Sequence, residues 1–392
     1  MDQLSATTPQ LDRHADLIRA LGGVHAQPLW DRYGRVTRRE PAAADAPMCW
    51  RWADMVPLVN RACLEVTMED AERRVLLLTH PAFADSFATT NNLSAGLQTL
   101  LPGEVARAHR HTLQAIRFVM EGGGALTSVN DQSCLMQPGD LILTPAWTWH
   151  EHVHPGSPAA PRGPLGPVGP GRADATAATD PAGDGRVVWF DGLDLPLCRG
   201  LDTMFFELAE PGKVAVDPVP TRLPALHRGA VVLPPDSADP DFWEHADAGS
   251  NGHGLKRAPS RFRYAKERAW AALHGALPEA DGSRLLRYVN GDSQGAVLPT
   301  LDCYLLACAR NQPTRRMRST GNAVCVVAEG QGTTQFGHGV GSQTIAWQRN
   351  DVFTLPHWQW VSHTATAGDA VIFMMTDYEF LASLGYLREE LA

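Results

Sequence analysis

This chain lacks the cysteine patterns of disulfide-rich and zinc-binding proteins. It contains seven cysteines, an odd number, and none of them forms a CxxC pair. The two nearest in sequence are Cys303 and Cys308. We therefore expect reduced, mostly buried thiols and neither a disulfide framework nor a zinc site.

Basic clusters and long apolar runs are missing as well. No segment is rich in lysine and arginine and the formal net charge is −9, so neither nucleic acid nor an anionic membrane is expected as a partner. No apolar stretch approaches the roughly 18 residues of a membrane-spanning helix. Residues 1–21 lack the apolar centre of a signal peptide. These absences predict a cytoplasmic protein.

The patterns that are present predict a β-rich protein of up to two domains. The apolar spacing favours helices at 8–21, 265–276 and 52–66, the last only if Pro57 lies in its first turn. Short β-rich runs separated by turn residues predict a sandwich or barrel. These runs are residues 74–78, 115–120, 140–144, 187–190, 301–308, 323–328 and 370–375.

Residues 155–186 differ in composition from the rest. Proline recurs at every third position from 155 to 170, a period that favours polyproline II, and glycine, alanine and aspartate fill much of the remainder. This composition is typical of a surface insertion.

Two strand-rich regions resemble each other, which indicates a duplicated domain. RFVMEGGGALTSV and PGDLILTPAWTWHEH in the first correspond to CVVAEGQGTTQFG and RNDVFTLPHWQWVSH in the second. The matched pairs are Glu121 with Glu329, Asp140 with Asp351, Pro145 with Pro356, Trp147 with Trp358, and His152 with His363. Three histidines of the first copy have no counterpart: at the positions of His109, His111 and His150 the second copy has Met317, Ser319 and Val361. This joint absence predicts one barrel with a metal and one that has lost it.

The three histidines have the spacing of a metal site. His109 and His111 are two apart, so on a strand both side chains point to one face. His150 follows the PAWTW turn, where a neighbouring strand can complete the set. Ala115 and Ile116 stand where a carboxylate ligand would be expected, so the ligands are three neutral imidazoles. Such a site suits a chelating dianion, for example a carboxylate with an ortho phenolate.

Further residues of the first copy allow two interpretations each. Arg117 is expected to point into the barrel, either as a clamp for a substrate carboxylate or as part of an internal salt bridge. His152 is interpreted as a proton donor or acceptor near the substrate, or as a structural residue, since His363 persists in the second copy. Trp147 and Trp149 are expected in the core.

The same segments resemble a known family, the bicupin ring-cleaving dioxygenases of the gentisate, salicylate and 1-hydroxy-2-naphthoate 1,2-dioxygenase group. The matching stretches are AERRVLLL, AGLQTLLPGEVARAHRHTLQAIRFVMEGGGA, QPGDLILTPAWTWHEH, WFDGLDLP, VFTLPHWQWVSH and LGYLREE. The resemblance implies an all-β-dominated bicupin, that is, two double-stranded β-helix (jelly-roll) barrels with N-terminal and linker helices. Its expected parts are a helical segment 1–70, a metal-binding cupin 71–200 with the insertion 155–186, a linker 201–295 and a metal-free cupin 296–392.

The resemblance also implies an activity. We expect an Fe(II)-dependent extradiol-type dioxygenase and a homotetramer that uses O2 to cleave a small aromatic hydroxy acid. Cleavage falls between the carboxyl-bearing and hydroxyl-bearing carbons of gentisate or a related salicylate. Carried over by position, the metal ligands are His109, His111 and His150, and the substrate or O2 contacts are Arg117, Gln98, Gly96, His152, Asp191 and Arg73.

One position departs from the family pattern. Members usually have an aromatic residue two before the Gly96 equivalent, and this chain has Ser94. A small residue there widens the pocket or adds a hydroxyl group. A halo- or nitrosalicylate, salicylate itself or 1-hydroxy-2-naphthoate is therefore an alternative to gentisate. Two other classes stay open: a zinc, manganese or nickel cupin with non-oxygenase chemistry, and a non-enzymatic bicupin.

Overall fold

The computed structural model describes residues 15–30, 32–38, 40–43, 45–130, 132–155, 185–209, 231–236 and 261–392. Two compact units divide the chain, Met1–Ala42 and Ala43–Ala392. The first contains helices α2 (Ala15–Gly23) and α3 (Tyr33–Val36), and α2 overlaps the helix predicted at 8–21. Residues 8–14 of that prediction, and residues 156–184 of the proline-rich insertion, lie outside the described residues. None of the described helices has the length and apolar character needed to span a bilayer.

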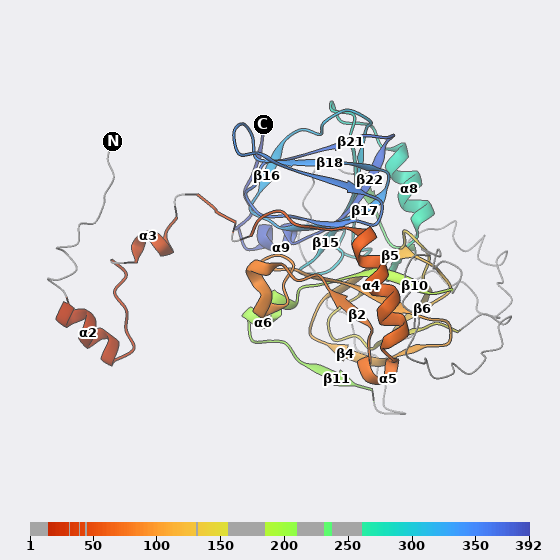
Figure 1. Cartoon of the computed structure of the whole chain (residues 1–392), viewed down its shortest axis with the longest axis horizontal. Helices are drawn as coiled ribbons and strands as arrows, with labels where there is room; N and C mark the ends of the chain where they lie inside the picture. Colours follow the sequence, from red (N-terminus) through yellow and green to blue (C-terminus); the bar gives the residue numbers. More distant parts are fainter. Residues whose placement is uncertain are drawn as a thin grey trace, which may run out of the picture. The chain divides into compact units, whose positions relative to one another are not determined.

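The second unit begins with an N-terminal barrel made of two sheets (Figure 1). In sheet order, the larger consists of β13 (Arg263–Tyr264), β8 (Leu141–Thr144), β5 (Ala115–Glu121), β10 (Val187–Leu193), β3 (Ser94–Leu100) and β2 (Val75–Leu77). The smaller consists of β11 (Phe206–Leu208), β4 (Val105–His111), β9 (His150–Val153), β6 (Leu126–Val129) and β7 (Gln132–Leu135). Its helices are α4 (Trp52–Glu65), α5 (Met68–Ala71), η1 (Pro81–Ser86) and α6 (Leu195–Gly200).

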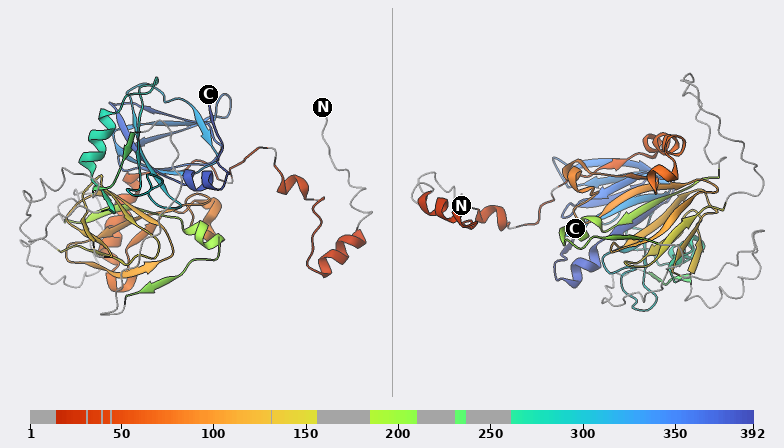
Figure 2. Two further views of the ribbon diagram at one scale, coloured as in Figure 1. Left: turned by 180° about the vertical axis from the view of Figure 1, so that it is seen from behind. Right: turned by 90° about the horizontal axis from the view of Figure 1, so that it is seen from below.

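A C-terminal barrel repeats this plan, and Figure 2 gives two further views of both barrels. Its larger sheet has the order β1 (Cys49–Trp50), β20 (Val352–Leu355), β17 (Ala323–Glu329), β22 (Ala370–Thr376), β15 (Asp302–Cys308), β14 (Arg284–Tyr288) and β12 (Val231–Leu233). Its smaller sheet has the order β19 (Gln343–Gln348), β18 (Gln331–Phe336), β21 (Val361–Ala365), β16 (Met317–Ser319) and β23 (Glu389–Leu391). Helices α8 (Lys266–Gly275) and α9 (Tyr378–Ser383) complete it.

The predicted bicupin fold is confirmed. Each predicted β-rich run overlaps a strand, and all seven cysteines are free, as expected. One detail was wrong: α4 begins at Trp52, so Pro57 lies beyond the first turn. Because proline has no N–H to donate, α4 gives up one backbone hydrogen bond there.

The two larger sheets share one hydrophobic core. Phe118 of β5 stacks on Phe373 of β22 with ring centroids 4.2 Å apart, and Phe190 of β10 contacts Phe373 edge-on. Consecutive strand residues point to opposite faces, so Arg117 and Asp191, which neighbour Phe118 and Phe190, point into the barrel. The outer face of this sheet therefore joins the barrels while its inner face is available for a site.

The barrels also exchange their leading strands. β1 pairs with β20 of the C-terminal barrel, and β13 pairs with β8 of the N-terminal barrel. The helices that follow these two strands, α4 and α8, begin with equivalent hydrogen bonds. The backbone N–H of Trp52 donates to Asp351 (2.7 Å), and the backbone N–H of Lys266 donates to Asp140 (2.9 Å). Each copy of the repeat thus contributes a strand to the barrel of the other.

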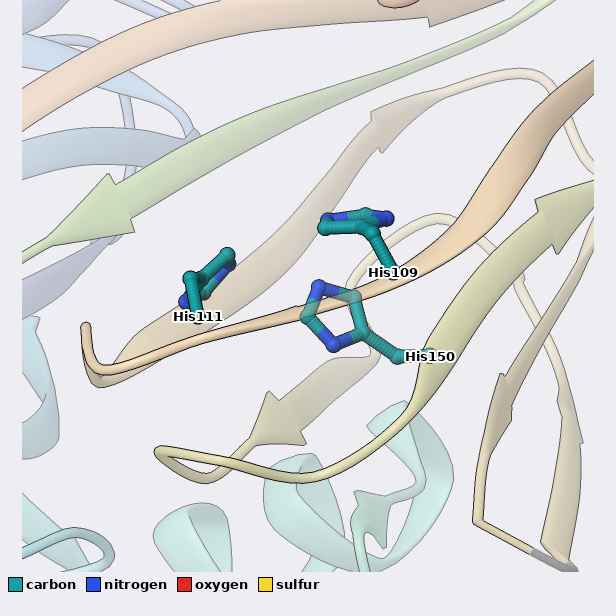
Figure 3. Close-up of side chains that lie close together, drawn as sticks. All are labelled: His109, His111 and His150. Carbon is teal, nitrogen blue, oxygen red and sulfur yellow. The ribbon is translucent and has the colours of Figure 1, made fainter. Parts of the chain in front are cut away.

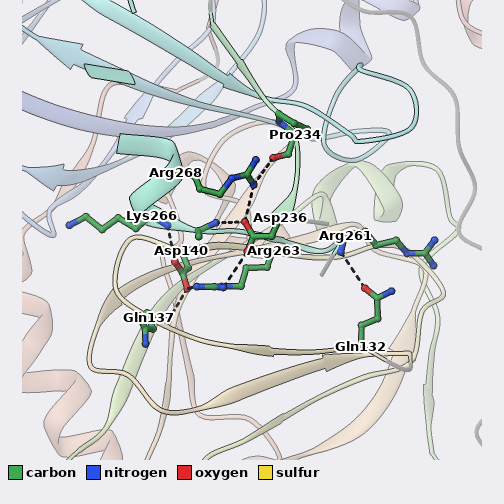
Figure 4. Close-up of polar contacts among 10 residues, drawn as sticks. Gln132, Gln137, Asp140, Pro234, Asp236, Arg261, Arg263, Lys266 and Arg268 are labelled. Atoms are coloured by element: carbon green, nitrogen blue, oxygen red, sulfur yellow. Dashed lines mark hydrogen bonds and ion pairs between the residues drawn. The ribbon is translucent and has the colours of Figure 1, made fainter. Parts of the chain in front are cut away.

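A buried ionic network fixes the second of these exchanges, shown in Figure 4. Arg263 donates from Nε to Asp140 (3.0 Å) and from a terminal nitrogen to Asp236 (3.2 Å). Arg268 donates to the other oxygen of Asp236 at 3.0 Å. Burial raises the pKa of Asp140 to about 6, and Arg263 opposes this shift. Removing one partner would leave a buried charge without compensation, so this network holds the segment from Arg263 to Arg268 against the N-terminal barrel.

Candidate metal centre

Three histidines converge inside the N-terminal barrel, from two adjacent strands of the smaller sheet. His109 and His111 lie on β4, and His150 on β9 pairs with His109 in strand register. Figure 3 shows the three rings directed toward one another. Each offers a ring nitrogen within 4.8 Å of the others, and all three residues are buried. The structure therefore brings together the three residues that the sequence predicted as ligands.

The backbone fixes which nitrogen of each ring is available. The Nδ1 atoms of His109, His111 and His150 lie 2.9, 3.1 and 2.9 Å from the carbonyl oxygens of Arg107, Leu113 and Thr148, respectively. A carbonyl only accepts, so each Nδ1 carries the proton and each Nε2 keeps a free lone pair. Metal-bound histidines have this same arrangement of a second hydrogen bond.

Burial keeps these imidazoles neutral. It lowers the pKa of His109 to about 2 and that of His111 to about 4, and the pKa of His150 lies well below its ordinary value. Nε2 of His150 is buried without a hydrogen-bond partner. Three neutral, inward-facing Nε2 atoms fit a divalent transition metal, and the unsatisfied Nε2 is explained if a metal binds there.

The larger sheet places an arginine opposite the histidines. Arg117 pairs with Asp191 across β5 and β10, and Asp191 pairs with Gly96 of β3. Arg117 donates to the hydroxyl of Thr144. Its Nε lies 3.7 Å from Oδ1 of Asp191, too far for a hydrogen bond, so both atoms are buried without one. The salt bridge foreseen for Arg117 is thus present, and Arg117 still has a donor for another anion.

Unsatisfied polar atoms gather on this inner face. Ser94 and Gln98 alternate with Leu97 and Ala95 along β3, so their side chains share the face of Gly96. Oγ of Ser94 and Nε2 of Gln98 are buried without a hydrogen-bond partner. Buried polar groups normally have partners, so their concentration beside the histidines indicates a place where a polar ligand binds.

His152 joins the two sheets. Its ring lies 5.2 Å from that of Trp189 on the larger sheet, and Oγ1 of Thr127 lies 2.8 Å from its Nδ1. No other acceptor for the Thr127 hydroxyl exists among the described residues, so this hydroxyl donates to Nδ1 and the proton of His152 sits on Nε2. That Nε2 is buried without a partner, and burial holds the pKa of His152 well below its ordinary value. His152 is therefore a neutral hydrogen-bond donor.

Two further residues complete the surroundings of His109. Phe206 of β11 stacks on its ring with centroids 5.2 Å apart, and the guanidinium of Arg73 lies 5.0 Å from the Phe206 ring. Arg73 also lowers the pKa of His109, second to burial, so it lies near the histidines. Phe206, Trp189 and Thr144 were missed as site residues. The internal repeat could have predicted β11. FEL (206–208) lies as far before EEL (389–391) in the sequence as Asp194 lies before Asp377, so the two segments are equivalent.

Strand register confirms the comparison with the second copy. Met317 pairs with Val361 as His109 pairs with His150. Cys325 pairs with Met374 as Arg117 pairs with Asp191. Met317 and Val361 therefore occupy the places of His109 and His150 in their own barrel.

Comparisons with known proteins agree with this site. A cupin domain family model matches residues 96–160. Gentisate 1,2-dioxygenase 1 of Aquipseudomonas alcaligenes is 32% identical over 92% of this chain and 92% of its own length. The 5-aminosalicylate 1,2-dioxygenase of a Comamonas species is 30% identical over 96% of this chain and 89% of its own.

Solved structures agree as well. A salicylate 1,2-dioxygenase from Pseudaminobacter salicylatoxidans superposes with a TM-score of 0.74 at 26% identity over 98% of both chains, and it has also been solved as adducts with gentisate. The resemblance stated from the sequence is confirmed. This chain belongs to the gentisate and salicylate 1,2-dioxygenase family of bicupin ring-cleaving dioxygenases.

Proposed function

We propose that this protein is an Fe(II)-dependent, extradiol-type dioxygenase that cleaves the ring of gentisate or a related substituted salicylate. O2 enters between the carboxyl-bearing and hydroxyl-bearing carbons. The observation that carries this proposal is the position of a buried arginine with an unused donor, Arg117, opposite three convergent neutral histidines. The names of the relatives, which act on gentisate and on aminosalicylate, support it.

His109, His111 and His150 would hold the iron. When bound, Fe(II) supplies the Lewis acidity and the electrons that bring O2 and a chelating hydroxy acid into reaction. Three neutral ligands leave the divalent charge uncompensated by the protein, which favours a substrate that arrives as a dianion. This charge balance disfavours a neutral substrate at the same place.

Arg117 orients the substrate. Its Nε hydrogen has no acceptor among the described residues of the protein, and a carboxylate is the group that satisfies a buried guanidinium best. Asp191 lies beside it, and burial raises the pKa of Asp191 while Arg117 opposes the shift. We assign Asp191 the role of holding the Arg117 side chain in place. Arg73, whose pKa burial lowers to about 10, adds positive charge on the side of His109.

His152 supplies a hydrogen bond. Its Nε2–H has no partner in the protein and stands on the same strand, two residues after His150. A neutral donor there stabilises negative charge that develops on oxygen during the reaction. Gln98 offers a second unsatisfied N–H from the opposite sheet.

Ser94 sets the space beside the ring. It is fully buried, and its Oγ has no partner. A small, polar residue at the place where the family pattern has an aromatic one suits a substrate with an additional ring or a polar substituent. Substituted salicylates and 1-hydroxy-2-naphthoate are therefore substrates to test beside gentisate. The homotetramer stays a prediction, to be checked by light scattering.

Oxygen uptake tests the proposal. Protein reconstituted anaerobically with Fe(II) is mixed with gentisate, salicylate, 5-aminosalicylate, halo- and nitrosalicylates and 1-hydroxy-2-naphthoate. Uptake of one O2 per substrate, with a new near-ultraviolet band from the ring-opened acid, is the expected result. Bound iron without uptake on any of these substrates would contradict it.

A further inference from the structure

The C-terminal barrel contains a cavity of about 620 Å³ where the N-terminal barrel has its metal centre. Met317, Ser319 and Val361, the counterparts of the three histidine ligands, line it. His363, the counterpart of His152, lines it too. The barrel that lost its metal has therefore kept an open interior at the equivalent position.

Four of the inward positions around this cavity are less polar than their counterparts in the N-terminal barrel. Strand register aligns Gln98 with Leu306, Thr144 with Leu355, and Asp191 with Met374. The same register places Cys325 where the other barrel has Arg117. None of these four inward positions carries a charge, so a hydroxy-acid dianion bound beside them would be desolvated without compensation, and a neutral compound fits better.

His363 presents a hydrogen-bond donor to this cavity. Nε1 of Trp347 donates to Oγ1 of Thr334 at 2.8 Å, and the same oxygen lies 2.8 Å from Nδ1 of His363. The hydroxyl of Thr334 has no other acceptor among the described residues, so it donates to Nδ1, and the proton of His363 is on Nε2. That Nε2 has no hydrogen-bond partner among the residues described. Burial lowers the pKa of His363 to about 4, which keeps the ring neutral.

The walls suit an aromatic ring. Tyr304 and Tyr378 lie 6.4 Å apart between ring centroids, and both line the cavity. The flexible thioethers of Met317 and Met374 line it as well, and sulfur packs well against aromatic edges. Pockets for small organic ligands measure about 300–1,000 Å³. Glu279 and Arg315 are exposed lining residues, so the cavity is accessible from solvent.

We propose that the C-terminal barrel is a second binding site, which takes a neutral aromatic compound with one hydrogen-bond acceptor, such as an aryl ketone or aldehyde. The acceptor binds Nε2–H of His363, and the ring lies between the tyrosines and methionines. This site is separate from the metal centre and does not depend on the ring-cleaving activity.

Fluorescence with prodan, an uncharged naphthyl ketone, tests the proposal on the full iron-loaded protein. We expect saturable binding of about one probe per chain with a blue-shifted emission. His363→Phe keeps a ring but removes the donor, and should weaken binding about fivefold, the effect of one neutral hydrogen bond. Leu306→Trp and Val361→Phe fill the cavity and should abolish binding, with thermal melting to verify that each variant is folded.

The other barrel provides the matched control. His152→Phe makes the same change beside the metal centre and should leave prodan affinity unchanged, as should saturating gentisate. Weakening by either would place the probe at the metal centre and overturn the proposal. Absence of saturable binding, or binding that survives both filling variants, would overturn it as well. Oxygen uptake on hydroxy acids is measured separately, so the outcome of the prodan experiment does not decide whether the proposed ring-cleaving activity is correct.

Discussion

The two barrels of this chain have the same framework and opposite interiors. In each, an arginine stacks on two tryptophans and forms an ion pair with the edge strand. Arg110 lies over Trp147 and Trp149 at 4.2 and 4.7 Å and pairs with Glu207. Arg318 lies over Trp358 and Trp360 at 4.3 and 4.9 Å and pairs with Glu390. Trp147 and Trp358 even share a positive φ of 61° and 59°.

The difference lies in the residues that face inward. The N-terminal barrel concentrates neutral histidines, an arginine–aspartate pair and unsatisfied donors around one point, whereas the C-terminal barrel has thioethers, aliphatic side chains, two tyrosines and one histidine there. The shared contacts stabilise the barrel, and the residues that differ determine what it binds. Paired substitutions in the two barrels can therefore separate function from fold.

The largest effect is expected at the metal ligands. His150→Ala leaves two ligands, so we expect iron content to fall close to zero and oxygen uptake to fall to background. The paired change Val361→Ala should leave about one iron per chain and normal uptake. Elemental analysis after anaerobic reconstitution measures both. Iron and turnover retained in His150→Ala would exclude this metal centre.

The next effect is expected at Arg117. Arg117→Met removes the carboxylate contact and leaves Asp191 unpaired, so kcat/KM should fall at least about 100-fold, the cost of truncating one partner of a buried charge pair. Arg117→Lys keeps the charge without the planar fork and should be intermediate. The paired change Cys325→Met should leave kcat/KM unaltered. If Arg117→Met retains full kcat/KM with bound iron, the arginine is structural only.

His152 and His363 have the same threonine contact but different surroundings. His152→Gln should lower kcat about 100-fold, as expected for loss of a positioned donor, with iron content unchanged. His363→Gln should leave kcat within about twofold. Steady-state kinetics on iron-loaded protein distinguishes them. Equal effects on kcat would mean that this histidine serves the fold in both barrels.

Much of this comparison could be predicted from the sequence. Alternation along the strands and the repeated EGxG and PxWxW turns identified the barrels, and the two-residue spacing of His109 and His111 identified the ligands. The exchange of β1 and β13 could not be predicted, because strands of two residues have no periodicity and form only through tertiary pairing. Phe206 was missed for a related reason: β11 is three residues long and exposed, and its position depends on pairing with β4.

The C-terminal cavity was missed for another reason. Met317, Ser319 and Val361 indicated the loss of a metal, but residue identities alone do not reveal how much space their side chains leave. Cavity volume depends on packing among distant residues such as Leu285 and Leu306, which no local pattern records.

Acid should destabilise the metal-free protein partly through His363. Its pKa is about 4 in the folded state and about 6.5 when unfolded, so between these values the unfolded chain binds more protons. The free energy of unfolding therefore falls as pH falls from 6.5 to 4, by up to about 3 kcal/mol for this group. His363→Gln should flatten that dependence in urea unfolding measured over this range. A slope that is unchanged would mean that His363 titrates normally in the folded protein.

The smallest effect is expected at the stacked arginine that both barrels have. Arg110→Ala and Arg318→Ala each remove a stacked guanidinium and a partly exposed ion pair, which together contribute about 1–2 kcal/mol. Thermal melting should show the same loss of a few degrees for both. Only Arg110→Ala should also lower kcat/KM, because Arg110 separates His109 from His111 on β4 and pairs with the strand that carries Phe206. Equal loss of activity in both variants would mean that stability of the whole chain, and not the local support of the ligands, limits turnover.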